Sequence, residues 1–318
     1  MQVLYFLESL RTPFWDTVMS AVTHLGEELV FIVAALLVFW CVDKYRGYYL
    51  MAVGFAGTLC NQFLKILCRV PRPWLLDPDF TIVESARAQA TGYSFPSGHT
   101  QNAVGTFGGI ARFTRRKWLR WVMILLAVLV SFSRLYLGVH TPWDVGVGLV
   151  TAVILVFALY PVMEKTRRSP ELLCAVIGGM VMLSAAYLLY LRIAGAPCAP
   201  TDVNYANYTA ALENARKLLG ATVGILLAAW LDERYIRFET DAVWWAQVLK
   251  LAMGLGLLVA LKAGLKQPLA SLLPAAADGV RYFLVILFAG AVWPLTFRFW
   301  GSLGRPRRRG GSYLYGTK

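Results

Sequence analysis

Charged residues and histidines are scarce in this sequence of 318 residues. Asp, Glu, Lys and Arg together make up 15% of the chain, and only three histidines are present. Hydrophobic residues account for 58%, and the mean hydropathy is +0.56. A chain of this length could form two soluble domains, but long apolar runs with so little charge exclude them. The composition indicates a polytopic membrane protein.

Cysteine is present but lacks the number and spacing of a structural framework. The five cysteines are odd in number, lie mostly within apolar runs and show no metal-ligand spacing. We therefore expect no disulfide framework, no zinc site and no cofactor. The N-terminus also lacks the basic and apolar regions of a cleavable signal peptide. The cysteines are Cys41, Cys60, Cys68, Cys174 and Cys198.

The formal net charge is +13, yet the basic residues are scattered between apolar runs. A nucleic-acid-binding protein would gather them on one face or stripe, so we expect no nucleic acid partner. Basic residues in short loops instead indicate the cytoplasmic side of a membrane protein. If the spans alternate strictly, these loops share one side. Exceptions that would face outward are Arg216, Lys217, Lys262, Lys266 and Arg281.

The hydropathy pattern predicts an all-α membrane helix bundle in three parts. Residues 1–22 have apolar residues at helical spacing among polar ones, which predicts an interfacial amphipathic helix, with a short re-entrant hairpin as the alternative. Residues 23–192 contain six apolar spans and form the expected core. Residues 193–318 add about three spans and end in a basic tail around Arg305–Arg309.

The segment Ser133–Asp144 joins two apolar runs and carries an arginine, a histidine and an aspartate. Ionisable groups at the end of a membrane span indicate a functional site. Pro142 suits the first turn of a new helix, which leaves His140 just before that helix and Asp144 one turn inside it. A carboxylate in this place can hold one imidazole nitrogen and leave the other free to attack.

Two earlier segments offer matching chemistry. One apolar run ends near Lys65, and Arg72 follows shortly after it. Cations therefore lie at the end of this span. Another run begins at Ser97-Gly98-His99, where a helix N-terminus presents unpaired N–H groups suited to an anion. Three cations, two imidazoles and these amides are what phosphoryl transfer needs. The alternatives are snorkelling anchors at helix ends and histidines that are only structural.

In order, the motifs K-x6-R-P, P-S-G-H and S-R-x5-H-x3-D resemble those of the type 2 phosphatidic acid phosphatase superfamily. The resemblance implies an integral membrane lipid phosphate phosphatase that needs no metal ion, with the six-span core as its catalytic unit. The substrate would be a phosphomonoester or pyrophosphate of an isoprenoid, glycerolipid or sphingoid lipid. The site would face outward from a cell membrane, and we expect a bacterial one.

The resemblance also implies roles for the motif residues. His140 is expected to be the nucleophile that forms a phosphohistidine, with Asp144 orienting its ring. His99 is expected to protonate the leaving alkoxide and then activate water. The expected phosphate ligands are Lys65, Arg72, Ser97, Gly98 and Arg134.

Two other functions fit the same residues. A lipid phosphotransferase would pass the phosphohistidine group to a hydroxyl acceptor instead of water. An anionic-lipid carrier or flippase would use the cations to hold a headgroup without chemistry. The sequence leaves open the lipid, the role of the last three spans and whether the protein forms a homo-oligomer.

Overall fold

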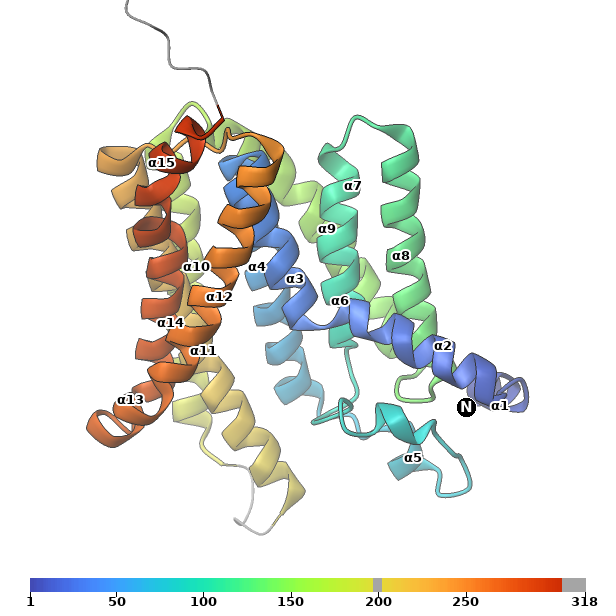
Figure 1. The fold of residues 1–318 in the computed structure, drawn as a ribbon. Helices are drawn as coiled ribbons and strands as arrows, with labels where there is room; N and C mark the ends of the chain where they lie inside the picture. Colours follow the sequence, from blue (N-terminus) through green and yellow to red (C-terminus); the bar gives the residue numbers. More distant parts are fainter. Residues whose placement is uncertain (197–201, 305–318) are drawn as a thin grey trace, which may run out of the picture.

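The computed structural model describes residues 1–196 and 202–304. Cys198 and the basic tail Arg305–Arg309 lie outside this range. The described residues contain helices and no strands, which confirms the predicted all-α fold. The helices run along one axis as a bundle, while the N-terminal helices lie across one end (Figure 1).

The N-terminal segment forms two helices, α1 (Gln2–Ser9) and α2 (Pro13–Thr23), instead of the single helix expected for residues 1–22. The break has a local cause, because Thr12 caps α2 by accepting from the N–H of Trp15, and Pro13 occupies the first helical turn. A short 3₁₀ turn, η1 (His24–Gly26), leads into α3 (Glu28–Leu37) and the π-turn η2 (Val38–Val42). The two parts, Pro13–Gly26 and Glu28–Val42, are bent by 51°.

The core continues through five further helical runs. One of these runs is a composite of three consecutive segments, and its middle segment is a π-helix. The runs are α4 (Lys44–Cys68), the composite α6 (Gly98–Ala103), η4 (Val104–Gly108) and α7 (Gly109–Phe113), α8 (Lys117–Tyr136), α9 (Pro142–Thr166) and α10 (Pro170–Ala194).

The C-terminal extension adds three long runs. Its helices are α11 (Val203–Leu231), α12 (Trp244–Gly264), α13 (Lys266–Leu272), and α14 (Ala277–Leu287) continued by η6 (Phe288–Val292), η7 (Trp293–Thr296) and α15 (Phe297–Ser302); η5 (Asp232–Ile236) follows α11. Among the described residues, six helices are long and apolar enough to cross a membrane, or up to seven with the bent pair. Residues 97–112, within the expected six-span core, and residues 215–231, within the expected three-span extension, are largely helical but fall outside that set.

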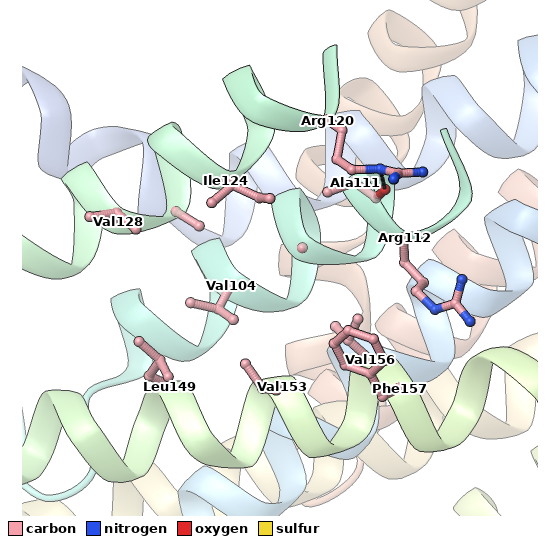
Figure 2. A pocket seen from close by; sticks show the side chains of 12 residues that line it. Val104, Ala111, Arg112, Arg120, Ile124, Val128, Leu149, Val153, Val156 and Phe157 are labelled. Atoms are coloured by element: carbon pink, nitrogen blue, oxygen red, sulfur yellow. Dashed lines mark hydrogen bonds between the residues drawn. The ribbon is translucent and has the colours of Figure 1, made fainter. Parts of the chain in front are cut away.

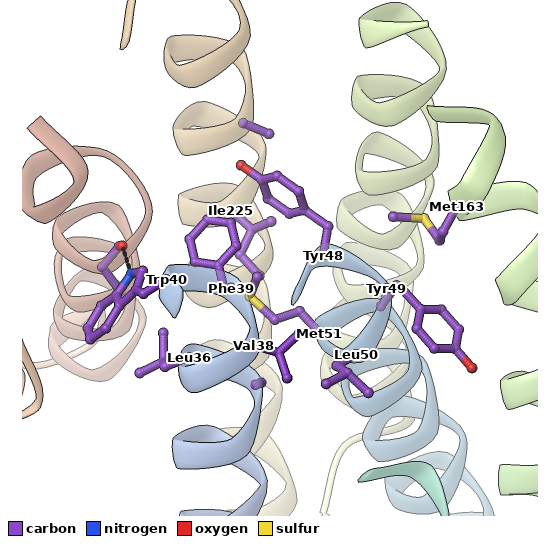
Figure 3. Packing of buried hydrophobic residues seen from close by; sticks show 14 of the residues in the cluster. Leu36, Val38, Phe39, Trp40, Tyr48, Tyr49, Leu50, Met51, Met163 and Ile225 are labelled. Carbon is purple, nitrogen blue, oxygen red and sulfur yellow. Dashed lines mark hydrogen bonds between the residues drawn. The ribbon is translucent and has the colours of Figure 1, made fainter. Parts of the chain in front are cut away.

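The extension packs directly on the core. Helix α11 lies against α10, α14 and α4. Gly220 makes the contact with α14 close, because a Cβ there would collide with the carbonyl oxygen of Gly279. At the end of the bundle away from the motifs, Phe39, Tyr48 and Met51 pack with Ile225 of α11, and the indole of Trp40 donates to the carbonyl of Ala289 at 2.9 Å (Figure 3). Core and extension therefore share one hydrophobic cluster.

The three motifs lie at one end of the bundle, on the side of α1, α2 and α5 (Pro73–Leu76), while the turn between α7 and α8 lies at the other (Figure 1). That turn contains Arg115 and Arg116. The separation of motifs from basic turns agrees with the pattern expected from the sequence. Which end faces the cytoplasm stays a prediction.

Candidate active site

Two cavities of similar size differ in their chemistry. One, of about 420 Å³, is bounded by the α6–α7 run, α8 and α9 (Figure 2). Its walls are apolar except for Arg112 and Arg120 at one end, and it contains no motif residue. The other, of about 390 Å³, lies at the motif end. It is lined by five of the expected site side chains, which are Lys65, Arg72, His99, Arg134 and His140, and also by Gly98.

Backbone carbonyls of the segment before α6 hold two of the cations. The Lys65 ammonium donates to the carbonyl of Tyr93 at 2.5 Å. The Arg72 guanidinium donates to the carbonyls of Thr91 and Gly92 at 2.7 and 3.1 Å. Gly92 has φ +68°, a conformation that glycine adopts without strain. Because carbonyls and not carboxylates fix these cations, their charges remain available to an anion.

Arg134 is fully buried at the end of α8. Its Nη1 donates to Oγ1 of Thr23 in α2 at 2.6 Å. Its Nε and Nη2, together with Nε2 of His99, are buried and have no hydrogen-bond partner among the described residues. Buried polar groups in proteins are nearly always bonded, so each such atom requires an explanation. Both residues line the same cavity, and a bound phosphate would supply the missing acceptors.

His140 and Asp144 are positioned by the start of α9. Thr141 and Asp144 form a capping box, in which Thr141 accepts from the N–H of Asp144 and the Asp144 carboxylate accepts from the N–H of Thr141. The same carboxylate oxygen lies 3.5 Å from Nδ1 of His140. Nε2 of His140 lies 3.0 Å from Nη1 of Arg72. These contacts fit the tautomer with its hydrogen on Nδ1 and its lone pair on Nε2.

The environment of His140 favours the neutral ring. The residue lies in the link between α8 and α9 and is 2% exposed. Burial, and then the nearby positive charge of Arg72, lowers the pKa of His140 well below its usual value. A neutral imidazole keeps a lone pair for attack on an electrophile.

Ser97 has a different position from the other expected phosphate ligands. Its hydroxyl caps α6 by accepting from the N–H of Thr100 at 3.4 Å, and its own N–H donates to the carbonyl of Asp144 at 2.9 Å. Ser97 therefore joins α6 to α9 and does not line the cavity, whereas Gly98 and His99 do. Its N–H is already bonded to Asp144, so it is not free for a phosphate oxygen.

The structure adds a serine that the sequence reasoning missed. The buried hydroxyl of Ser94 donates to Oδ2 of Asp144 at 2.5 Å and lies 3.5 Å from Nδ1 of His140. Ser94 precedes the P-S-G-H motif, and no local pattern ties it to an aspartate fifty residues later. The pattern Thr141-Pro142-Trp143-Asp144, by contrast, is a capping-box signature that the sequence itself displays.

One wall of the cavity comes from the C-terminal extension. The first half of α11 contributes side chains to the cavity lining, although this part of the chain carries none of the three motifs. They are Ala206, Asn207, Ala210, Ala211 and Asn214. No group of three or more His, Cys, Asp or Glu side chains in residues 1–196 and 202–304 is arranged to hold a metal ion.

Comparison with known families matches two parts of the chain. Residues 46–168 match the model of the PAP2 superfamily. Residues 216–305 match a model described as PAP2 superfamily phosphatase, transmembrane extension. All three motifs fall within the first match, and the cavity-lining part of α11 falls between the two.

Similar proteins of known function are phosphatases. The chain is 30% identical over 160 residues to lipid A 4'-phosphatase of Bacteroides thetaiotaomicron, covering 47% of this chain and 70% of that protein. It is 30% identical over 175 residues to phosphatidylglycerophosphatase B of Bacillus subtilis, covering 50% and 80%. The crystal structure of a transmembrane PAP2-type phosphatidylglycerolphosphate phosphatase from Bacillus subtilis is 29% identical, with coverage of 52% and 84% and a TM-score of 0.43.

Proposed function

Because the chain belongs to the PAP2 superfamily and is a multi-pass membrane lipid phosphatase, we propose that it hydrolyses a lipid phosphomonoester or pyrophosphate through a phosphohistidine at His140. The observation that carries the proposal is the set of unpartnered buried nitrogens on Arg134 and His99, in the cavity that also holds the His140 ring. Cations and imidazoles around one space are suited to one phosphate group.

The three cations bind the phosphate. Arg134 can donate two parallel hydrogen bonds to phosphate oxygens through its Nε and Nη2. Arg72 keeps one N–H on Nη2 beside its bond to the carbonyl of Thr91, and Lys65 adds a compact charge. The cavity-facing N–H groups at the start of α6 add the positive end of a short helix beside Gly98. Together they stabilise the charge that the equatorial oxygens carry in the transition state.

The first step breaks the ester bond. The lone pair of His140 Nε2 attacks phosphorus and forms an N–P bond as the bond to the lipid oxygen breaks. His99 donates a proton to that leaving oxygen, which departs as an alcohol. Asp144, 3.5 Å from Nδ1, stabilises the positive charge that the His140 ring acquires.

The second step returns the enzyme to its starting state. His99 takes a proton from a water molecule whose oxygen attacks phosphorus. The N–P bond breaks, its electron pair returns to Nε2 of His140, and inorganic phosphate leaves. We propose that the site opens to the outside of a cell membrane, because the basic turns lie at the opposite end of the bundle.

The test is phosphate release by the purified protein in detergent, with a lipid phosphate as substrate and no acceptor alcohol. His140→Asn should reduce turnover by at least about a thousandfold, because the nucleophile is lost. Brief reaction with substrate labelled on phosphorus should leave acid-labile, base-stable label on the protein, and the variant should carry none.

His24→Asn is the matched control. His24 is exposed, bonds to Glu27 at 2.6 Å and does not line the cavity, so this variant should keep most of its activity. Full phosphatase activity in His140→Asn would contradict the mechanism. Turnover that requires an added hydroxyl acceptor would identify a phosphotransferase, and transport that survives His140→Asn without phosphate release would identify a carrier.

A further inference from the structure

The catalytic cavity has a second wall with a different composition from the first. The motif residues form the charged wall. In the remaining lining, α4 contributes Asn61 and Gln62, and α11 contributes five residues that recur along one helical face. The five are Ala206, Asn207, Ala210, Ala211 and Asn214. Alanines between the two asparagines leave room beside their carboxamides.

Helix α11 is fixed to the segment that holds the catalytic cations. The hydroxyl of Tyr93 donates to Oδ1 of Asn204 at 2.6 Å, while the carbonyl of Tyr93 accepts from Lys65. Ala211 and Ala215 pack with Tyr93 and Ile66 in one buried cluster. The start of α11 is therefore held in register with the phosphate site.

Asn207 lies next to the turn that positions Arg72. A Cβ built on Gly92 would lie 3.8 Å from Oδ1 of Asn207, and the carbonyl of Gly92 accepts from Arg72. Asn214 follows Asn207 by two helical turns on the same face. The two carboxamides thus extend from the phosphate site along the cavity.

The polar groups on this wall differ in whether they are already engaged. Asn61 donates to the carbonyl of Pro96 at 3.2 Å, and Gln89 donates to Glu27 at 2.9 Å. No hydrogen bond joins the carboxamide of Asn207 or Asn214 to another described residue. Their donors and acceptors remain available to a ligand.

The wall is also uncharged. Apart from the motif cations, no charged side chain is among the described residues that line this cavity. An ammonium beside the phosphate would be partly buried near three cationic side chains with no carboxylate in the described lining, which is unfavourable. Hydroxyl groups suit a carboxamide, which can donate to them and accept from them.

In-line attack places the leaving oxygen opposite His140. With the phosphate held by the motif residues, the leaving alcohol occupies the remaining space between α4 and α11. We propose that Asn207 and Asn214 form a headgroup subsite that binds hydroxyl groups of the leaving alcohol, and that the enzyme favours phosphate esters of polyols. This inference rests on the proposed function and assigns part of the substrate choice to the extension.

The experiment compares three lipid monophosphates on the purified full-length protein. Phosphatidylglycerol phosphate has a hydroxyl and no ammonium on its leaving alcohol, sphingosine 1-phosphate has a hydroxyl and also an ammonium near its phosphate, and a polyisoprenyl monophosphate has neither group. In Asn207→Ala/Asn214→Ala, kcat/KM for the glycerol substrate relative to the polyisoprenyl substrate should fall about tenfold, mainly through KM, because two hydrogen bonds are lost. The wild-type protein should use the sphingoid substrate least well.

Thr209→Ala is the matched control, because Thr209 is exposed on the same helix and does not line the cavity. It should leave the substrate ratio unchanged. An unchanged ratio in the double asparagine variant, or an equal loss for both substrates, would overturn the subsite. A wild-type protein that releases phosphate from none of the three substrates would instead contradict the proposed function.

Discussion

Arg134 and Thr23 are joined by a hydrogen bond of 2.6 Å between Nη1 and Oγ1, and both side chains are buried. This bond joins α8, which carries the proposed phosphate ligand Arg134, to α2 in the N-terminal segment. It occupies one guanidinium nitrogen and leaves the other two for the phosphate. The N-terminal segment therefore helps to position a side chain of the cavity that the motif residues line.

Thr23→Val should raise KM for a lipid phosphate about fivefold, since the loss of one hydrogen bond lets the guanidinium move away from the phosphate position. The change in kcat should be smaller. Steady-state kinetics on the purified variant measure both. Thr17→Val, at an exposed position of α2, serves as the control, and an unchanged KM in Thr23→Val would show that Arg134 is positioned without the hydroxyl.

Ser94→Ala should lower kcat by about tenfold or more. The hydroxyl donates to the carboxylate that faces Nδ1 of His140, and hydrogen bonds to charged groups contribute about 1.5–3 kcal/mol. KM should change less, because Ser94 does not contact the phosphate site directly. The control is Ser85→Ala, at an exposed serine whose hydroxyl hydrogen-bonds to that of Ser20. If the Ser94→Ala variant kept the wild-type kcat, Ser94 would have no role in the mechanism.

His99→Ala should affect substrates according to their leaving groups. A lipid alkoxide needs a proton as it departs, whereas p-nitrophenolate is stable without one. The variant should therefore lose about a hundredfold or more in kcat/KM on a lipid phosphate and much less on p-nitrophenyl phosphate. The comparison uses kcat/KM because this constant reports the step that releases the leaving group and not the later attack of water. Equal losses on both substrates would contradict the assignment of His99 as the general acid.

Chelators should leave the activity unchanged. Three cationic side chains from the motifs meet the charge of the phosphate, and no carboxylate cluster lies among them. Phosphate release by the purified protein should be the same before and after dialysis against EDTA. Loss of activity on dialysis, restored by added magnesium or manganese, would show that a metal ion takes part.

The membrane orientation can be tested with a native cysteine. Cys68 is exposed at the end of α4, at the motif end of the bundle. A variant that keeps Cys68 and replaces the other four cysteines with serine should react with an impermeant maleimide in intact cells. The same variant with Cys68→Ser is the control, because any label that it takes up does not come from Cys68. Labelling only after the cells are opened would place the motifs on the cytoplasmic side.

Much of the cavity could be predicted from the sequence, because its charged residues lie in short motifs at helix ends. Lys65 lies in the last turn of α4 and His99 in the first turn of α6. His140 and Asp144 lie on either side of the first residue of α9. A bundle brings such ends together. The capping box at Thr141 has a local signature, so it could also be predicted from the sequence.

The other contributions depend on packing between distant segments. Ser94 reaches Asp144, and Thr23 reaches Arg134, across separations that no local pattern encodes. The N–H of Ser97 was expected to face the phosphate, but the backbone of α9 binds it. The break at Thr12 and Pro13 was visible in the sequence, although the helical spacing of apolar residues favoured one continuous helix.

Main-chain oxygens at positions 91–93 set the places of Lys65 and Arg72. The proposed reaction therefore uses no side chain of that segment, although its turn requires Gly92 and the Tyr93 hydroxyl holds α11. Substitutions at Thr91 and at the cavity-lining positions of α11 would leave in place the main-chain oxygens that hold Lys65 and Arg72. New lipid preferences can then arise by substitution while the rate of bond breaking is retained.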